Sequence, residues 1–151
     1  MSSRFRLVQS ITMKRRHVDL TSDDKYGHWW FVIGDPLDAD SESYGWWPEY
    51  PVKWVGTITG IRGDSNGQTR FRGEPTRDPH HYDNGDEEFH PFVAASDPRT
   101  DDQIADCLRA FARSCVGAWR WTFGSGLNCH SFQEDAMKHC LLYKRIPKNY
   151  L

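Results

Sequence analysis

Hydrophobic and polar positions alternate over the first sixty residues as they do in strands. Aromatic or β-branched runs cover residues 5–8, 11–20, 29–33, 44–47 and 52–61. Turn-forming groups such as Gly34-Asp35-Pro36 separate these runs. The pattern predicts an antiparallel sheet.

The pattern is lost between residues 62 and 98, where Gly, Asp, Asn, Pro and His dominate without a sustained period. We predict a long loop there, with room for one hairpin. Loops longer than about 15 residues in a compact domain are usually functional or disordered. This loop lies between His28 and Cys129, which are proposed below as catalytic residues, so we expect it to be a lid or insertion over a cleft.

Helical periodicity marks the last third of the chain. Thr100 followed by Gln103 is a capping-box pattern. The apolar face of that predicted helix comprises Ile104, Cys107, Leu108, Phe111, Ala112 and Cys115. A second helix, capped by Asn128, is expected to begin at Cys129. Its apolar stripe comprises Phe132, Ala136, Met137, Cys140 and Leu141. A sheet followed by helices predicts an α+β fold.

Composition limits the class of protein. With 151 residues, the chain has the length of one domain, residues 1–151. Nineteen basic residues against 21 acidic ones give a net charge of −2, which disfavours a dedicated nucleic-acid binder. Aromatic residues make up 14% of the chain and supply apolar surface for a core, which excludes wholesale disorder.

The sequence predicts a protein made in the cytoplasm without a signal peptide and without a transmembrane segment, because its apolar runs are too short for either. Its four cysteines form no CxxC pair and are not spaced like those of a secreted disulfide scaffold: Cys107, Cys115, Cys129 and Cys140. We therefore expect reduced thiols.

Cys129 is the candidate nucleophile. At the first turn of a helix, unpaired backbone N–H groups and the helix dipole stabilise a thiolate and lower the pKa of a cysteine. The same N–H groups can hold an oxyanion. The alternative is a small buried cysteine that packs in the core.

His28 is the candidate base. It opens the run Tyr26-Gly27-His28-Trp29-Trp30, the most strand-like in the chain. Alternation places His28, Trp30 and Val32 on one face of the sheet. On its own, a histidine at a strand end is more often half-exposed and without function.

Together, the histidine-led strand that ends in Ile33-Gly34-Asp35 and the segment Asn128-Cys129-x-x-Phe132 resemble circularly permuted papain-like hydrolases and transferases. These include permuted relatives of NlpC-type peptidoglycan peptidases and lecithin:retinol acyltransferase-like enzymes. The order, with His28 before Cys129, matches that permuted group. The resemblance implies a papain-like fold, a cysteine–histidine dyad and acyl transfer through a thioester, without a cofactor.

Four further runs are similar to those of polymorphic-toxin and type VI secretion effector domains; they begin at Tyr26, Ser43, Asp78 and Asn128. This likeness implies an antibacterial effector that cleaves the peptide part of the cell wall after delivery to the periplasm of a target cell. It also implies an immunity protein and a secretion apparatus as partners.

In the resembled family, a polar residue on the next strand orients the histidine. Glu42 and Ser43 are the candidates here, and the chemistry favours Glu42 because a carboxylate stabilises imidazolium. We expect substrate contacts from Trp30, Tyr44, Trp46, Asn128 and His130, although core packing is the commoner use of such aromatic residues.

A metal site is not expected at the helix. Cys129 and Cys140 lie roughly 16 Å apart along a helix, too far for both to bind one zinc ion. Histidines and acids in the loop (His80, His81, His90) leave a second metal hypothesis open, beside the simpler interpretation of a solvated acidic loop.

Two other functions remain open. The same dyad would serve an acyltransferase, a thioesterase or a deamidase that acts on a lipid or protein target. In the third hypothesis, the chain is a non-catalytic, aromatic-rich binding module or adaptor, and Cys129 is structural.

Overall fold

The computed structural model describes residues 4–17, 27–48, 61–69, 71–115, 118–119 and 129–146. The strands are β1 (Phe5–Leu7), β2 (Ile11–His17), β3 (Gly27–Ile33), β4 (Glu42–Pro48), β5 (Ile61–Ser65), β6 (Glu87–Phe89), β7 (Phe92–Ala94) and β8 (Ala118–Trp119). The helices are α2 (Asp101–Ser114) and α3 (Cys129–His139). The chain is therefore α+β, as the sequence predicts.

One antiparallel sheet has the strand order β6-β2-β3-β4-β5-β8, and β1 pairs with β7 in a separate two-stranded sheet. Trp30 faces Gly45 across β3 and β4, and Phe31 faces Tyr44. Because facing residues point the same way, this register assigns each side chain to one of two faces.

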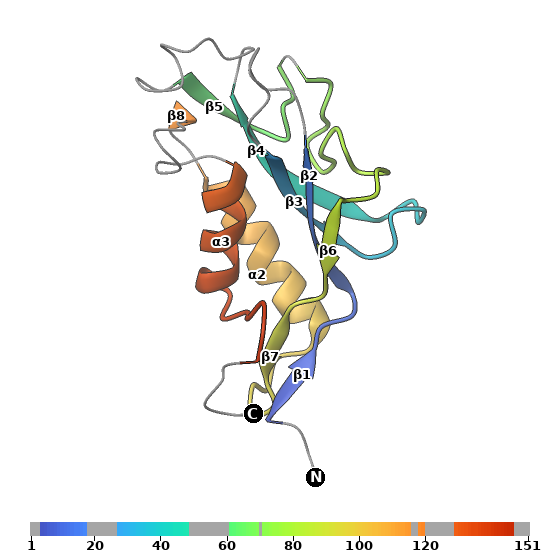
Figure 1. Ribbon diagram of the computed structural model, residues 1–151, viewed down its shortest axis with the longest axis vertical. Coiled ribbons are helices and arrows are strands. Elements are labelled where there is room, and N and C mark those ends of the chain that lie inside the picture. The colour runs from blue at the N-terminus through green and yellow to red at the C-terminus, as the bar shows by residue number, and fades with distance from the viewer. Residues whose placement is uncertain are drawn as a thin grey trace.

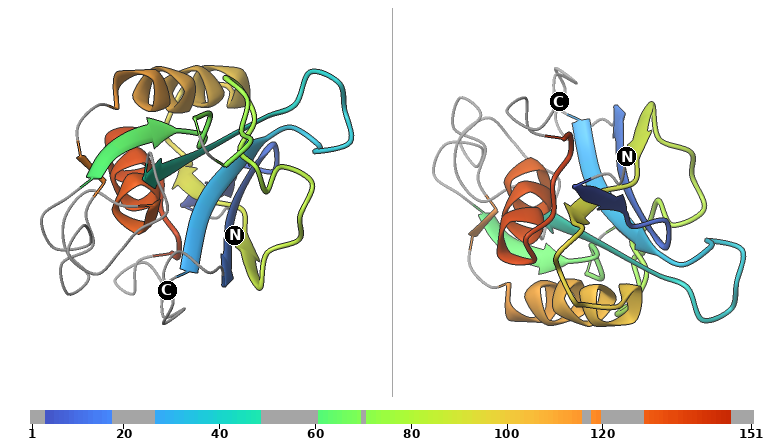
Figure 2. Two further views of the ribbon diagram at one scale, coloured as in Figure 1. Left: turned by 90° about the horizontal axis from the view of Figure 1, so that it is seen from above. Right: turned by 90° about the horizontal axis from the view of Figure 1, so that it is seen from below.

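Both helices pack on the same face of the large sheet (Figures 1 and 2). Phe132 of α3 stacks on Phe31 and Trp46, with ring centroids 5.8 and 6.4 Å apart. Phe111 of α2 lies 5.5 Å from Phe132. The side-chain amide of Gln133 donates to backbone carbonyls of β2 and β3, which fixes α3 across these strands.

The predicted α2 is confirmed, and so is its capping box. The Thr100 hydroxyl accepts a hydrogen bond from the Gln103 N–H, and the Gln103 side chain accepts one from the Thr100 N–H. Helix α3 begins at Cys129 as predicted. Its expected stripe is wrong at Leu141, which follows the helix with a φ of 56° and is 62% exposed. The predicted strand over residues 52–61 lies outside the described residues, except for Ile61.

Residues 62–98 differ most from the prediction. They include most of β5 and all of β6 and β7, so this region is not one long loop. β5 and β6 carry mostly polar side chains, and β7, although apolar, has three residues, so none of them gives a sustained hydrophobic alternation. We call residues 71–83, between β5 and β6, the covering segment. That this segment acts as a lid stays a prediction.

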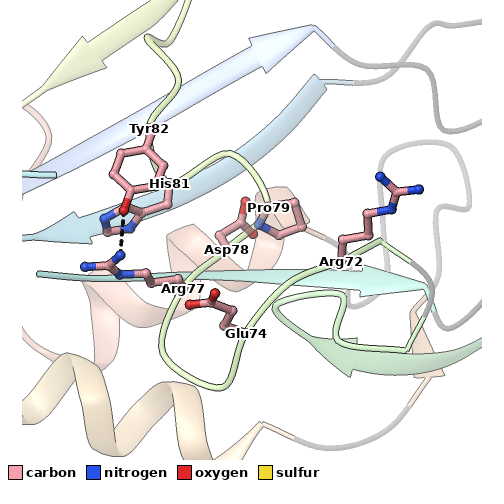
Figure 3. A pocket seen from close by; sticks show the side chains of 7 residues that line it. All are labelled: Arg72, Glu74, Arg77, Asp78, Pro79, His81 and Tyr82. Atoms are coloured by element: carbon pink, nitrogen blue, oxygen red, sulfur yellow. Dashed lines mark hydrogen bonds between the residues drawn. The ribbon is translucent and has the colours of Figure 1, made fainter. Parts of the chain in front are cut away.

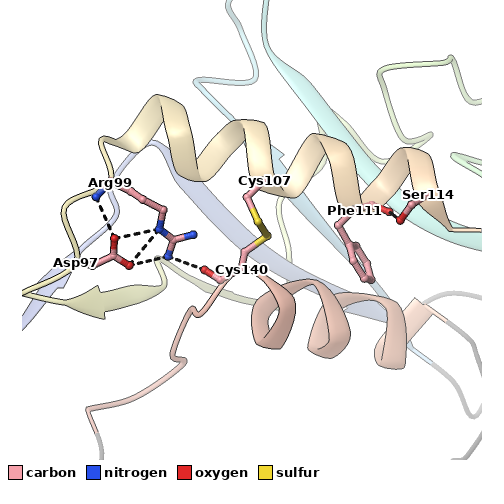
Figure 4. The surroundings of a disulfide bond; sticks show 6 residues. All are labelled: Asp97, Arg99, Cys107, Phe111, Ser114 and Cys140. Atoms are coloured by element: carbon pink, nitrogen blue, oxygen red, sulfur yellow. Dashed lines mark hydrogen bonds and ion pairs between the residues drawn. A yellow bond between two sulfur atoms is a disulfide. The ribbon is translucent and has the colours of Figure 1, made fainter.

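The expectation of reduced thiols is wrong for two of the four cysteines. Cys107 of α2 and Cys140, directly after α3, form a disulfide with their Cα atoms 5.9 Å apart (Figure 4). Arg99 donates to the Cys140 carbonyl at 2.7 Å and pairs with Asp97. The spacing could not reveal this bond, because it depends on how two helices pack.

Within the part of the chain that the structure describes, no helix has both the length and the apolar character needed to cross a membrane.

Candidate active site

Three elements carrying predicted site residues converge at one end of the sheet. β3 begins there and β4 ends there, because the two strands are antiparallel. Helix α3 begins there too, since the His130 ring lies 4.5 Å from the ring of Trp29. The beginnings of β3 and α3, which contain His28 and Cys129, therefore lie at the same end of the molecule (Figure 1).

His28 is fully buried and pairs with an acid that the sequence analysis did not single out for this role. Its Nε2 lies 3.0 Å from Oδ2 of Asp78 in the covering segment, and neither side chain is exposed. A carboxylate only accepts hydrogen bonds, so Nε2 carries the proton. His28 Nδ1 is buried and has no hydrogen-bond partner among the described residues.

Asp78 is held by three donors. Its Oδ2 accepts from His28 and from the indole N–H of Trp47 at 2.7 Å, and its Oδ1 accepts from the backbone N–H of His80 at 2.9 Å. Burial raises the pKa of Asp78, but the charge and hydrogen bond of His28, with the other two donors, bring the net pKa below its usual value. Asp78 is therefore a carboxylate at neutral pH.

Gly45 allows this close approach. A Cβ atom at position 45 would collide with Asp78 Oδ2 and would lie 2.9 Å from the imidazole of His28. Gly45 is also bonded on both sides of its backbone to Asn66, which has a φ of 58°. Because position 45 has no side chain, the covering segment can pack closely against β4.

A second histidine supports the backbone of Asp78. The Ser43 hydroxyl accepts from the Asp78 N–H at 2.8 Å and lies 2.8 Å from His81 Nδ1. His81 Nε2 contacts the Pro36 carbonyl at 3.1 Å, so Nε2 carries the proton and Nδ1 accepts from Ser43. Burial, and next the charge of Arg77, lower the pKa of His81, which favours its neutral form.

The side chain of Asn66, which is fully buried, ties the covering segment to the sheet. Its amide nitrogen donates to the carbonyls of Ser43 and Glu74, each at 3.0 Å, while its oxygen accepts from the Gly45 N–H. Arg77 adds hydrogen bonds to the carbonyls of Asp38, Ala39 and Ser41. These bonds anchor the segment that delivers Asp78.

A polar pocket of about 150 Å³ opens on the covering segment (Figure 3). Its lining comprises Arg72, Glu74, Arg77, Asp78, Pro79, His81 and Tyr82. Arg77 donates to the Tyr82 hydroxyl at 2.6 Å. Asp78 and His81 belong both to this lining and to the buried network below it.

Glu42 is not the residue that orients His28. Its side chain lies on the helix face of the sheet, where it accepts from the Tyr44 hydroxyl and from Arg109, each at 2.6 Å. Register is the reason, because neighbouring residues of β4 point to opposite faces. Ser43 does lie on the face of His28, but it contacts the Asp78 N–H rather than the imidazole.

Of the predicted substrate contacts, Tyr44 and Trp46 are core residues. Each is 2% exposed on the helix face, so the expectation that they contact substrate is corrected. Burial, and next the hydrogen bond to Glu42, raise the pKa of Tyr44. Trp30 shares the face of His28 and stacks on it at 5.6 Å, but it is fully buried, so its expected contact with substrate is corrected as well.

The residues around the candidate nucleophile Cys129 are placed in part. Cys129 is the first residue of α3, while Asn128 lies outside the described residues. His130 pairs with Glu134 at 3.0 Å and packs on Trp29. Helix α3 packs on the face opposite to the His28 ring, since Trp29 and Phe31 point toward α3 and His28 and Trp30 point away.

Sequence reasoning missed Asp78 and Trp47 as partners of His28. Asp78 is 50 residues away in a segment without periodicity. The one available signal was the run Asp78-Pro79-His80-His81, which the sequence analysis assigned to an effector likeness or a metal site. Among the described residues, no group of three or more His, Cys, Asp or Glu side chains could hold a metal ion.

Comparison with known proteins gives no relative for this arrangement: no family model, no curated protein and no solved structure matches the chain.

Proposed function

We propose that the protein is a cysteine hydrolase of the permuted papain-like type that cleaves amide bonds. In this proposal, Cys129 is the nucleophile, His28 is its base and Asp78 orients His28. The observation that carries the proposal is the buried His28–Asp78 pair, in which Nε2 is bound to a carboxylate and Nδ1 has no partner among the described residues. General-base catalysis requires a base that is held in one tautomer and whose other nitrogen is unpaired.

The proposed reaction is acyl transfer. The Cys129 thiol gives its proton to His28 Nδ1, and the thiolate attacks the amide carbonyl while the backbone N–H of Cys129 supports the oxyanion. The imidazolium returns the proton to the leaving amine, and a thioester remains. Water activated by His28 then releases the acid and restores the thiol.

The proposal sets a geometric requirement. Because α3 packs on the face opposite to the imidazole, the thiol must reach Nδ1 around the beginning of β3. His28 is the second residue of that strand, so only Gly27 separates it from the strand end.

We further propose that the substrate is the peptide part of the bacterial cell wall and that the protein acts as an effector in the periplasm of a target cell. The Cys107–Cys140 disulfide supports this compartment, because the periplasm is oxidising and the cytoplasm keeps thiols reduced. An immunity protein and a secretion apparatus are the partners that this role implies.

The first experiment measures iodoacetamide alkylation of each cysteine against pH by mass spectrometry. In this structure, the three cysteines other than Cys129 should contribute little to the alkylation signal. Two cysteines are in the disulfide, and burial, followed by the charge of Asp135, raises the pKa of Cys115 to about 11. A fast-reacting thiol would therefore be Cys129.

Three variants complete that experiment: His28→Gln, Asp78→Asn, and His139→Gln as a control at the far end of α3. We expect Cys129 to titrate well below about 8.5 in the native protein, and the first two variants to raise that value while the control leaves it unchanged. If the apparent pKa of Cys129 is that of an ordinary thiol and is the same in the native protein and in His28→Gln, the dyad is refuted.

Substrate and compartment need a second experiment. Digestion of purified peptidoglycan should release new amines, and Cys129→Ala should abolish the release. Expression should harm bacteria when the protein is exported to the periplasm. Harm from cytoplasmic expression alone would exclude the wall and favour a lipid acyltransferase, thioesterase or protein deamidase that uses the same dyad.

One observation favours the alternative of a non-catalytic binding module: α3 and the His28 ring lie on opposite faces. In that case, Cys129→Ala would retain all biological activity, and the His28–Asp78 pair would serve only to fasten the covering segment.

A further inference from the structure

Trp47 contacts both members of the His28–Asp78 pair with one side chain. Its indole N–H donates to Asp78 Oδ2 at 2.7 Å. Its ring lies 4.0 Å from the imidazole of His28, with an angle of 37° between the planes. Since Trp30 pairs with Gly45 in antiparallel register, His28 and Trp47 occupy the next same-face positions on β3 and β4.

These contacts prevent rotation of the Asp78 carboxylate. Oδ2 receives donors from His28 and Trp47, and Oδ1 receives the His80 N–H, so the group cannot turn without losing a hydrogen bond. The indole is itself held from another side, because Phe71 stacks on it at 4.8 Å. Asp78 thus has a fixed direction toward His28.

Burial alone does not give a tryptophan such a partner. Trp30 and Trp46 are as buried as Trp47, and their Nε1 atoms have no hydrogen-bond partner among the described residues. Trp30 also stacks on His28, at 5.6 Å. The molecule therefore contains a matched pair, because both indoles pack on the imidazole and Trp47 alone of the two also binds Asp78.

We infer that Trp47 is a positioning residue: its N–H holds Asp78 in the orientation that fixes the ring of His28 and the direction of its Nδ1 atom. The inference rests on the proposed function for its catalytic consequence. The holding of His28 itself is a structural claim that can be measured separately. Removal of one hydrogen bond to a charged group typically changes an equilibrium about ten-fold or more.

The experiment replaces single N–H groups. The tryptophan analogue β-(3-benzothienyl)alanine, which has sulfur in place of the indole N–H, is introduced at position 47 or at position 30 in the full chain. Trp47→Phe and Trp30→Phe serve as a second pair, and thermal unfolding checks that each variant is folded. Two quantities are measured: the solvent exchange rate of the His28 Nε2 proton by ¹⁵N NMR, and the alkylation rate of Cys129 at pH 7.

We expect the analogue at position 47 to speed exchange of the His28 proton by about ten-fold and to slow Cys129 alkylation by a similar factor. The analogue at position 30 should change both rates by less than about two-fold, because the N–H of Trp30 has no hydrogen-bond partner among the described residues. Equal effects at the two positions, or an unchanged His28 proton with the position 47 analogue, would overturn the inference.

The two readouts separate this inference from the proposed function. If the His28 proton responds to position 47 while Cys129 reacts independently of His28, the positioning of His28 stands and the cysteine hydrolase is refuted. If Cys129 depends on His28 while position 47 has no effect, the dyad stands and the role of Trp47 is refuted.

Discussion

The two faces of the large sheet are held by different interactions. Under α2 and α3, packing of aromatic rings such as Phe31, Trp46 and Phe132 predominates, with a few hydrogen bonds from Gln133 and Arg109 beside it. On the other face, His28 and Ser43 meet the covering segment through hydrogen bonds with an assigned donor and acceptor. Apolar packing tolerates small changes of shape, whereas a buried polar network fails when one partner is removed. The geometry of the second face is therefore more sensitive to substitution, and it fixes the orientation of its polar side chains more closely.

The largest effect is expected on the helix face. Phe132→Ala should lower the free energy of unfolding by about 3–5 kcal/mol, because it empties the space between α3 and two rings of the sheet. Denaturant unfolding measures this loss. In the fraction that remains folded, the His28 Nε2 proton should exchange at the native rate. Faster exchange would show that the two faces are coupled and would break the comparison.

The disulfide comes next. Its reduction, or the double change Cys107→Ala with Cys140→Ala, should cost about 3–4 kcal/mol, since it closes a loop with a sequence separation of 33 residues. Unfolding with and without a reductant gives the value. Cys115→Ala is the control: it keeps the disulfide and should lose as much stability on reduction as the native protein does.

On the polar face, Asn66→Ala should cost about 2–3 kcal/mol, because it leaves the Gly45 N–H and the Ser43 and Glu74 carbonyls without their bonds. We expect hydrogen exchange to rise in residues 71–83 before it rises in α2. A uniform rise across both faces would argue that the covering segment is not a separate unit.

The smallest effect is a pH dependence from His81. Since burial and the Arg77 charge lower its pKa in the folded protein, the unfolded chain binds more protons below about pH 6.5. Above about pH 6.5, His81 should not change the free energy of unfolding. Below that pH, the free energy of unfolding should decrease as the pH falls, because the unfolded chain takes up a proton that folded His81 binds less readily. His81→Gln should flatten the decline, as measured by unfolding at a series of pH values. An identical slope in the variant would assign the decline to other groups.

The sequence predicts local structure far better than long-range contacts. The capping box at Thr100 lies within four residues, so α2 could be placed correctly from the sequence. Alternation in β3 likewise predicted that His28 and Trp30 share a face, as their stacked rings confirm. Both predictions depend on neighbours in the chain.

The partners of His28 depend instead on three-dimensional packing. Asp78 reaches His28 because Gly45 leaves room for it and Asn66 holds the backbone by hydrogen bonds. The hydrophobic pattern of the sequence does not predict either of these roles. Glu42 was preferred over Ser43 because a carboxylate suits the chemistry, yet the register of β4 points Glu42 to the helices. The disulfide was missed for the same reason as Asp78.

The two ends of the described chain touch each other. The Phe5 ring lies 5.5 Å from Tyr143, the Ala95 N–H donates to the Arg4 carbonyl, and Tyr143 pairs with Phe92 of β7. In Figure 1, this region lies at the end of the molecule opposite to the start of α3. A chain joined there and opened in another surface turn would carry residue 129 before residue 28 and keep both in place. The order of histidine and cysteine along the sequence is thus independent of the geometry between them.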